Sequence, residues 1–249
     1  MKRSIDLNSD LGEGAGFDDE LLSLVSSANI ACGFHAGDAH SMKRTISAAG
    51  ARNVAIGAHP SLFDRENFGR TESSVTPEQV FDAVAYQLGV FQAIAEAVGA
   101  RVRHVKPHGA LYNMAAREVG LAAAIVRAIS EADQTLLLFA PGGSALDRAG
   151  RSGGIRVVTE VFADRNYLND GSLVPRTRPD ALLADPVAAA KRVIRILRDN
   201  KVQSVDGKDV SISAETICLH GDTPGAVEFA RTLRRHLEAE GIEIRAPDR

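Results

Sequence analysis

The chain alternates short apolar runs with longer segments in which apolar residues recur every three or four positions. The short runs predict buried strands, and the longer periodic segments predict amphipathic helices. Because the runs are continuously apolar, they are typical of a parallel sheet covered on both faces. The pattern predicts strands at residues 4–7, 28–32, 54–58, 102–105, 135–140, 155–161 and 217–219.

Seven helices are predicted between and after these strands. The clearest one follows Thr76, because Pro77 suits the first helical position, Gln79 completes a capping box and Gly99 ends the apolar stripe. The others are expected to begin near residues 18, 41, 121, 144, 185 and 223. Residues 164–182 are predicted to form a long irregular loop, and residues 205–212 a small hairpin.

Strands that alternate with helices indicate a parallel α/β fold with the helices outside the sheet. The 249 residues show no linker-like break in composition, so we expect a single domain spanning residues 1–249. The pattern alone leaves two architectures open, a closed barrel and an open doubly wound sheet. The chain contains neither a dinucleotide-binding G-x-G-x-x-G after the first strand nor a P-loop.

Charge and composition narrow the class of partner. The formal net charge is −3 and the basic residues are scattered, so neither nucleic acid nor an anionic membrane is an expected partner. No leader segment and no apolar stretch approaching the ~18 residues of a membrane span is visible, which predicts a cytoplasmic protein. Cys32 and Cys218 are expected to be buried, reduced thiols, and a homo-oligomer is compatible with the sequence.

Polar side chains follow the ends of most predicted strands. In parallel α/β folds the active site lies at the carboxyl ends of the strands, so these residues are expected to meet there. In strand order they are Asp6, Asn8, Asp10 and Glu13; His35 and Asp38; His59; Lys106 and His108; Glu160, Asp164 and Arg165; and His220 and Asp222.

Several candidate site residues could instead have a purely structural role. His35 and Asp38 suit a general base with its orienting carboxylate, or metal ligands, but Asp38 could equally cap the following helix. Lys106 could stabilise an oxyanion or phosphate, or form an interior ion pair. Arg70 and Arg176, in long loops, could clamp a carboxylate or phosphate or simply face solvent.

The residue types at this rim favour hydrolysis through an activated water. Histidine, aspartate and glutamate are abundant, whereas no reactive cysteine and no serine nucleophile is evident. The reaction itself cannot be chosen from these residues alone.

Eight motifs, in order and spacing, resemble the LamB/YcsF family and together cover nearly the whole chain. They are DLNSDLGE (6–13), NIACGFHAGD (29–38), GAHPS (57–61), NFGR (67–70), VKPHGALYN (105–113), EVFADRNY (160–167), GSLVPR (171–176) and ICLHGD (217–222). Two positions depart from the pattern: Ala39 stands where proline is common, and Thr71 stands where arginine is common.

The resemblance implies a distorted seven-stranded (β/α) barrel, TIM-like and similar to that of polysaccharide deacetylases. It implies the ATP-dependent hydrolysis of 5-oxo-L-proline (pyroglutamate) to L-glutamate by a 5-oxoprolinase, with two partner subunits, B and C. ATP, with Mg²⁺ as its usual counter-ion, would be a co-substrate, although the missing P-loop leaves its site unlocated.

The rim residues supply the group types that such a reaction needs. We predict acid–base or electrostatic roles for Asp10, His35, Asp38, His59, Lys106, His108 and His220, and substrate-binding roles for Asn8, Glu13, Arg70, Glu160, Arg165 and Arg176. If a metal is bound, its expected ligands are Asp10, His35 and His59. Two other functions stay open: a stand-alone metal-dependent amidohydrolase or carbohydrate deacetylase, and a non-catalytic binding subunit.

Overall fold

Seven parallel strands close into a barrel in the part of the chain that the computed structural model describes, residues 4–221 and 225–248. The sheet closes because β1 pairs with β2 on one side and with β9 on the other. The strands of the barrel are β1 (Ser4–Leu11), β2 (Ser27–Ala31), β3 (Ala55–His59), β4 (Val102–Val105), β5 (Leu137–Pro141), β6 (Val157–Phe162) and β9 (Thr216–Leu219).

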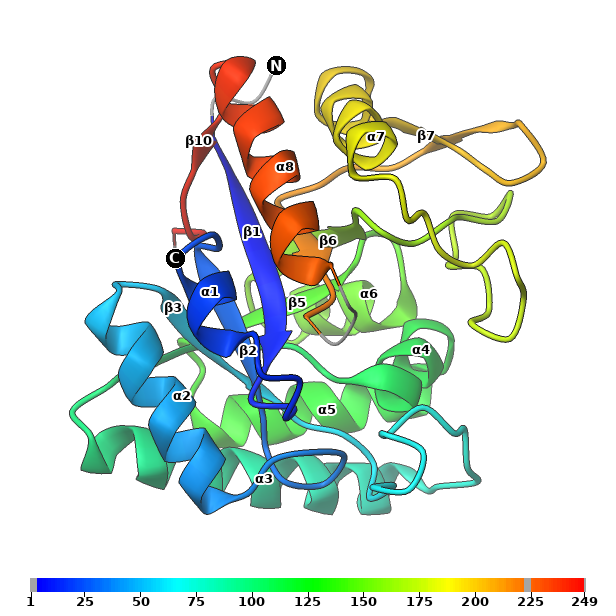
Figure 1. Cartoon of the computed structure of the whole chain (residues 1–249). Coiled ribbons are helices and arrows are strands. Elements are labelled where there is room, and N and C mark those ends of the chain that lie inside the picture. Colours follow the sequence, from blue (N-terminus) through cyan, green and yellow to red (C-terminus); the bar gives the residue numbers. More distant parts are fainter. Residues whose placement is uncertain (1–3, 222–224, 249) are drawn as a thin grey trace.

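The helices surround the strands, with α2, α3 and α5 on one side and α7 and α8 on another (Figure 1). Their bounds are α1 (Asp18–Leu22), α2 (Ala39–Ala51), α3 (Pro77–Ala97), α4 (Gly109–Arg117), α5 (Val119–Ala132), α6 (Ala145–Ser152), α7 (Pro186–Asp199) and α8 (Ala226–Ala239). Three short strands complete the described elements: β7 (Lys201–Gln203), β8 (Asp209–Ser211) and β10 (Glu243–Ile244).

The closed barrel decides between the two architectures that the sequence left open. All seven predicted strands are confirmed, as is the capping box of α3, in which Thr76 and Gln79 bond each other's backbone N–H groups. The irregular segment 164–182 is also confirmed, since it holds only two isolated bridges. Asp222 and the predicted start of the last helix, at residues 223–224, lie outside the described residues.

Besides the length of the first strand, three features were predicted wrongly. The helix α4 was missed because it is short and because its start, at the glycine of Lys-Pro-His-Gly, has a sequence that is typical of a loop. The strand β10, which extends the sheet beside β1, was also missed. The hairpin exists, but its first strand is Lys201–Gln203, before the predicted range.

The first strand is longer than predicted because its inward face is polar. Ile5, Leu7 and Leu11 face the hydrophobic core between barrel and helices, whereas Asp6 and Asn8 are equally buried but contact polar groups inside the barrel. Such polar side chains are typical of turns in sequence, yet here they occupy alternate positions of a strand. The barrel interior is therefore a polar site.

The opposite part of the barrel interior is apolar. Leu137, Phe139 and Val158 form a separate buried cluster, and the ring of His104 stacks on Phe139 with centroids 4.1 Å apart. Gly57 is required opposite this ring, because a Cβ atom there would lie 2.1 Å from His104 Nε2. Among the described residues, no helix has the length and apolar content that would let it cross a membrane.

Candidate active site

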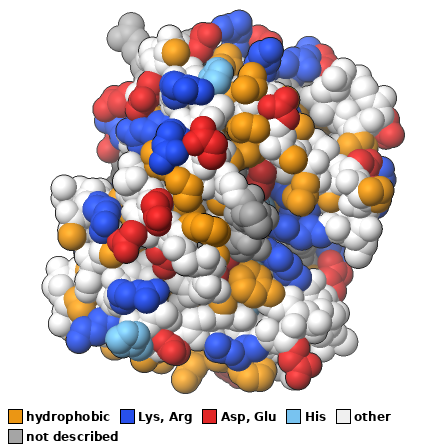
Figure 2. Space-filling view, in the orientation of Figure 1, with side chains coloured by type: hydrophobic (Ala, Val, Ile, Leu, Met, Phe, Trp, Pro, Cys, Tyr) orange, Lys and Arg blue, Asp and Glu red, His pale blue; other side chains and the backbone are white. Residues whose placement is uncertain are grey.

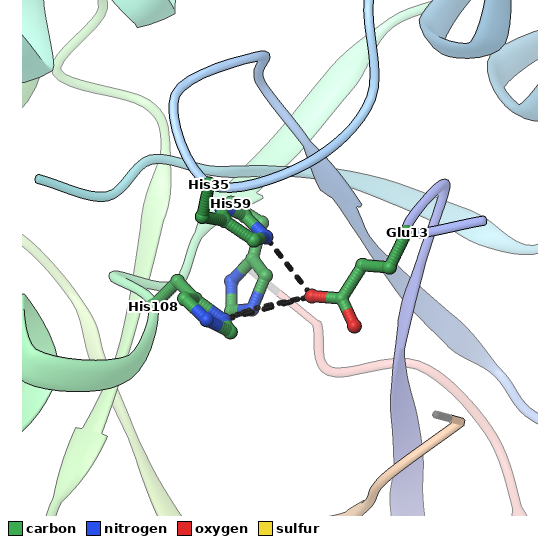
Figure 3. Close-up of side chains that lie close together, drawn as sticks. All are labelled: Glu13, His35, His59 and His108. Carbon is green, nitrogen blue, oxygen red and sulfur yellow. Dashed lines mark hydrogen bonds and ion pairs between the residues drawn. The ribbon is translucent and has the colours of Figure 1, made fainter. Parts of the chain in front are cut away.

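Four side chains from the carboxyl ends of consecutive strands converge on one point (Figure 3). Glu13 follows β1, His35 follows β2, His59 is the last residue of β3, and His108 follows β4. The Glu13 Oε1 atom lies 3.0 Å from His35 Nε2, 3.6 Å from His108 Nδ1 and 4.0 Å from His59 Nε2. Each residue offers one metal-ligand atom, and these four atoms lie within 4.8 Å of one another. We call these four residues the histidine cluster.

Burial keeps two of these imidazoles neutral. It lowers the pKa of His35 and of His108 well below the ordinary value of 6.5, and the neighbouring His59 lowers the pKa of both further. The rings of His35 and His108 stack face to face, 3.8 Å apart. Two stacked imidazolium ions would repel each other at that distance, so the neutral forms agree with the geometry.

A lysine lies inside the barrel beside the histidine cluster. The Nζ atom of Lys106 is 2.8 Å from Asp10 Oδ1 and 3.2 Å from Glu160 Oε1, and it also contacts Asn8 Oδ1 at 3.3 Å and Cys218 Sγ at 2.9 Å. Burial would lower the pKa of Lys106, but Asp10 and the other acidic neighbours outweigh it and raise that pKa well above 10.5. Lys106 is thus a permanent buried cation.

Asp10 joins Lys106 to the histidine cluster. Its Oδ1 atom accepts hydrogen bonds from Lys106 and from Asn29 Nδ2 (2.8 Å), and its Oδ2 atom lies 3.3 Å from His59 Nε2. Burial would raise the pKa of Asp10, but His59 and Lys106 outweigh it and hold that pKa well below 3.8. Asp10 therefore remains an anion at neutral pH.

A second acid–base pair lies on the other side of the barrel mouth. The Nδ1 atom of His220 is 2.7 Å from Asp164 Oδ2. Burial would raise the pKa of Asp164, but His220 outweighs it, so that pKa is lowered. The ring of Phe162 separates the two centres, since His220 stacks on it at 5.7 Å and Lys106 Nζ lies 5.4 Å from its centroid.

Three arginines at this mouth act on one another. Burial, followed by the charge of Arg176, lowers the pKa of Arg165 to about 10, and Arg70 also contributes to that lowering. The Nη2 atom of Arg165 donates to the Val174 carbonyl at 2.6 Å, while its buried Nε atom has no partner among the described residues. On the face shown in Figure 2, basic side chains gather beside α4. Like charges held this close favour an anionic ligand.

Asp38 does not join either centre. Its side chain is exposed and accepts a hydrogen bond from the Ser41 backbone N–H at 2.8 Å, which caps helix α2. The structure therefore supports the alternative interpretation of Asp38 as a helix cap. The cap satisfies an N-terminal backbone N–H group that has no partner within the helix. The other twelve predicted site residues lie in the histidine cluster, around Lys106 or at the mouth.

Sequence reasoning missed several residues of the site. Asn29 connects Asn8, Asp10 and His104 through its side-chain amide. Asn29 is the central residue of β2, and sequence reasoning assigned it to the strand without a role in the site. Tyr112, on the missed helix α4, has a buried hydroxyl without a hydrogen-bond partner among the described residues.

The metal-ligand set also differs from the prediction. Asp10, His35 and His59 were expected, whereas the converging atoms belong to Glu13, His35, His59 and His108, with Asp10 beside them. Glu13 follows a glycine turn after β1, and sequence alone does not show that this turn directs it back over the barrel.

Deeper in the barrel, burial raises the pKa of Asp6 to about 6, although hydrogen bonds from Ser26, Ser27 and Thr216 partly offset the effect. The inward face of β1 therefore carries one carboxyl with a raised pKa and one, on Asp10, with a lowered pKa. Opposite shifts of this kind are typical of functional sites.

Several known proteins are similar to this chain in sequence or in structure. The model of the LamB/YcsF family matches residues 5–249. The A subunit of the 5-oxoprolinase of Oceanobacillus iheyensis is 49% identical over 98% of this chain and 97% of its own. The crystal structure of a lactam utilization protein from Thermus thermophilus has a TM-score of 0.91 and 43% identity, over 98% of this chain and 100% of that one. The polysaccharide deacetylase Bc1974 from Bacillus cereus shares only the fold, with a TM-score of 0.52 and 14% identity over 98% and 92% of the two chains.

Proposed function

The chain belongs to the LamB/YcsF family, and on that premise we propose that it is the A subunit of a 5-oxoprolinase. Together with the B and C subunits, it would hydrolyse 5-oxo-L-proline to L-glutamate in a reaction driven by ATP. The near-complete coverage of both chains in the comparison with the Oceanobacillus relative supports the proposal, because no large segment of that relative is missing here.

The observation that carries the proposal is the buried Lys106 between Asp10 and Glu160, next to the histidine cluster. A five-membered lactam is a stabilised amide, and transfer of a phosphoryl group from ATP to its oxygen, with release of ADP, would open the ring carbon to attack by water. The ring C–N bond then breaks, the nitrogen takes up a proton and phosphate leaves. Such a reaction needs a cation for the developing charge on oxygen and a base for the water. The barrel mouth holds both kinds of group.

We assign the positive charge to Lys106 and the proton transfer to His220. The Nδ1–H group of His220 donates a hydrogen bond to the Asp164 carboxylate, so Nε2 carries the lone pair that a base requires. Asp164 orients the ring through this hydrogen bond.

The arginines at the mouth suit the anionic parts of the substrates. Arg70, Arg165 and Arg176 are assigned to the carboxylate of 5-oxoproline or to the phosphates of ATP. The sequence has no P-loop, so we assign part of the ATP site to the partner subunits.

The proposal is tested by glutamate release from 5-oxoproline. The chain is assayed alone and with both partner subunits, each with and without ATP. We expect release only from the three-subunit mixture with ATP. Turnover of 5-oxoproline or of acetylated sugars by the chain alone, without ATP, would replace the proposal with a stand-alone hydrolase.

A further inference from the structure

The outer contacts of the histidine cluster fix which ring nitrogen carries the proton. The Nδ1 atom of His59 lies 2.6 Å from the Lys106 carbonyl oxygen, and the Nε2 atom of His108 lies 2.8 Å from the Phe68 carbonyl oxygen. A carbonyl can only accept a hydrogen bond, so each of these nitrogens carries a hydrogen. In the neutral rings, His59 Nε2 and His108 Nδ1 therefore hold lone pairs.

The third ring is fixed in the same way through a hydroxyl. The Oγ atom of Ser61 donates to the Leu62 carbonyl oxygen at 2.9 Å, which uses its only hydrogen. It must therefore accept from His35 Nδ1, 3.0 Å away. The Nε2 atom of His35 is left with a lone pair, and it points at Glu13 Oε1.

Three lone pairs and one carboxylate oxygen thus face one another, and none of these four atoms is a donor to the other three. His59 Nε2 and His108 Nδ1 are only 2.9 Å apart, and two acceptors at that distance repel each other unless a proton or cation lies between them. A single proton can join only one pair of these atoms. A cation at the centre satisfies all four.

We propose that Glu13, His35, His59 and His108 bind one divalent transition-metal ion. Three imidazole nitrogens and one carboxylate oxygen form a donor set that suits Zn²⁺ or a neighbouring first-row metal rather than Mg²⁺ or Ca²⁺. Tetrahedral coordination with bonds of ~2.1 Å places ligand atoms about 3.4 Å apart. The four atoms are separated by 2.9 Å to at most 4.8 Å, so side-chain shifts of about 1 Å would bring them to that spacing.

The surroundings show the features of a built metal site. Each histidine donates its outer N–H to a fixed acceptor, the arrangement by which proteins orient metal-binding imidazoles. The backbone of residue 69 packs directly against the cluster, since a Cβ atom there would lie 2.8 Å from His35 Cβ and 2.9 Å from His108 Cδ2. Phe68 adopts a left-handed conformation (φ 58°), which is strained for an aromatic residue, and its carbonyl accepts from His108.

The inference does not rest on the proposed function, because its readout is bound metal rather than released glutamate. The full-length chain is stripped with a chelator and dialysed against Zn²⁺ or Co²⁺. Bound metal is then counted by mass spectrometry, and the visible absorption of Co²⁺ reports its ligand geometry. We expect one ion per chain and a rise in the temperature of unfolding when metal is added.

Variants separate this site from surface histidines. Glu13→Gln and His108→Ala should abolish stoichiometric binding, and Ser61→Ala, which removes an outer acceptor, should weaken affinity by about 10- to 100-fold. His40→Ala is the matched control, because His40 is exposed on α2. The proposal fails if the unmodified chain binds no stoichiometric metal, a result that needs no variant to fold. It also fails if His40→Ala lowers binding as much as His108→Ala does.

Discussion

Replacing Lys106 with methionine tests the charge balance inside the barrel. The change keeps most of the side-chain volume but leaves Asp10 and Glu160 buried without their cation, which lies 2.8 and 3.2 Å from them. Removing one partner of a buried ion pair costs about 3–5 kcal/mol. Since domains are stable by about 5–15 kcal/mol, Lys106→Met should fold but lose a large part of its free energy of unfolding.

The cost should depend on pH. In the unmodified chain the lowered pKa of Asp10 contributes stability above pH 3.8, and this contribution is lost as the pH falls through the folded-state pKa. In the variant the unpaired carboxyls have raised pKa values and gain stability when they are protonated. The difference between the two proteins should therefore be largest near pH 7 and shrink towards pH 4.

Urea unfolding followed by far-UV circular dichroism is the appropriate assay, because the chain has no tryptophan. Lys43→Met, at an exposed position on α2, is the matched control and should change little. A cost below ~1 kcal/mol for Lys106→Met, or one that does not vary with pH, would refute the view that Lys106 balances these carboxylates.

Three further predictions follow from single residues. Gly69→Ala and Gly143→Ala share a left-handed backbone (φ 66° and 73°), but only Gly69→Ala places a Cβ atom against His35 and His108, so only that variant should lose bound metal. Equal metal content in the two would contradict the packing argument. Asp6 has a pKa raised from 3.8 to about 6, so its contribution to stability is present at low pH and lost between pH ~4 and 6. Compared with Asp6→Asn, the unmodified chain should lose about 3 kcal/mol of its free energy of unfolding over that rise in pH. If urea unfolding gives the same pH dependence for both proteins, the assignment of this effect to Asp6 is wrong. Asp38→Ala should lower the unfolding temperature slightly through the lost helix cap and leave glutamate release unchanged, whereas a large loss of activity would return Asp38 to the site.

The strands of the barrel could be predicted because their outward faces are apolar and their ends carry glycine, proline or histidine. Closure could not, because a closed barrel and an open sheet bury the same runs, and only the resemblance to a family favoured the barrel. The first strand was predicted too short because Asn8 and Asp10 face a polar interior, which reverses the usual rule that buried strand positions are apolar.

The site was predictable where strand ends supply the side chains. His35, His59 and His108 follow or end three consecutive strands, and the parallel fold brings them together. Asp38 and Asn29 were not predictable, because an aspartate before a helix serves equally as a cap, and an asparagine within a strand gives no chemical signal. The pairing of Glu13 with the histidines depends on the path of one glycine-rich turn, which sequence does not fix.

The central claim is that the buried polar groups at the barrel mouth carry out the hydrolysis. The most direct measurement compares glutamate release by the three-subunit assembly containing either the unmodified chain or Asp10→Asn, with circular dichroism and co-purification confirming that the variant folds and assembles. Asp10 contacts Lys106 and lies beside His59, so we expect a loss of more than ~100-fold. Activity close to that of the unmodified assembly would contradict the claim and make this chain a non-catalytic subunit.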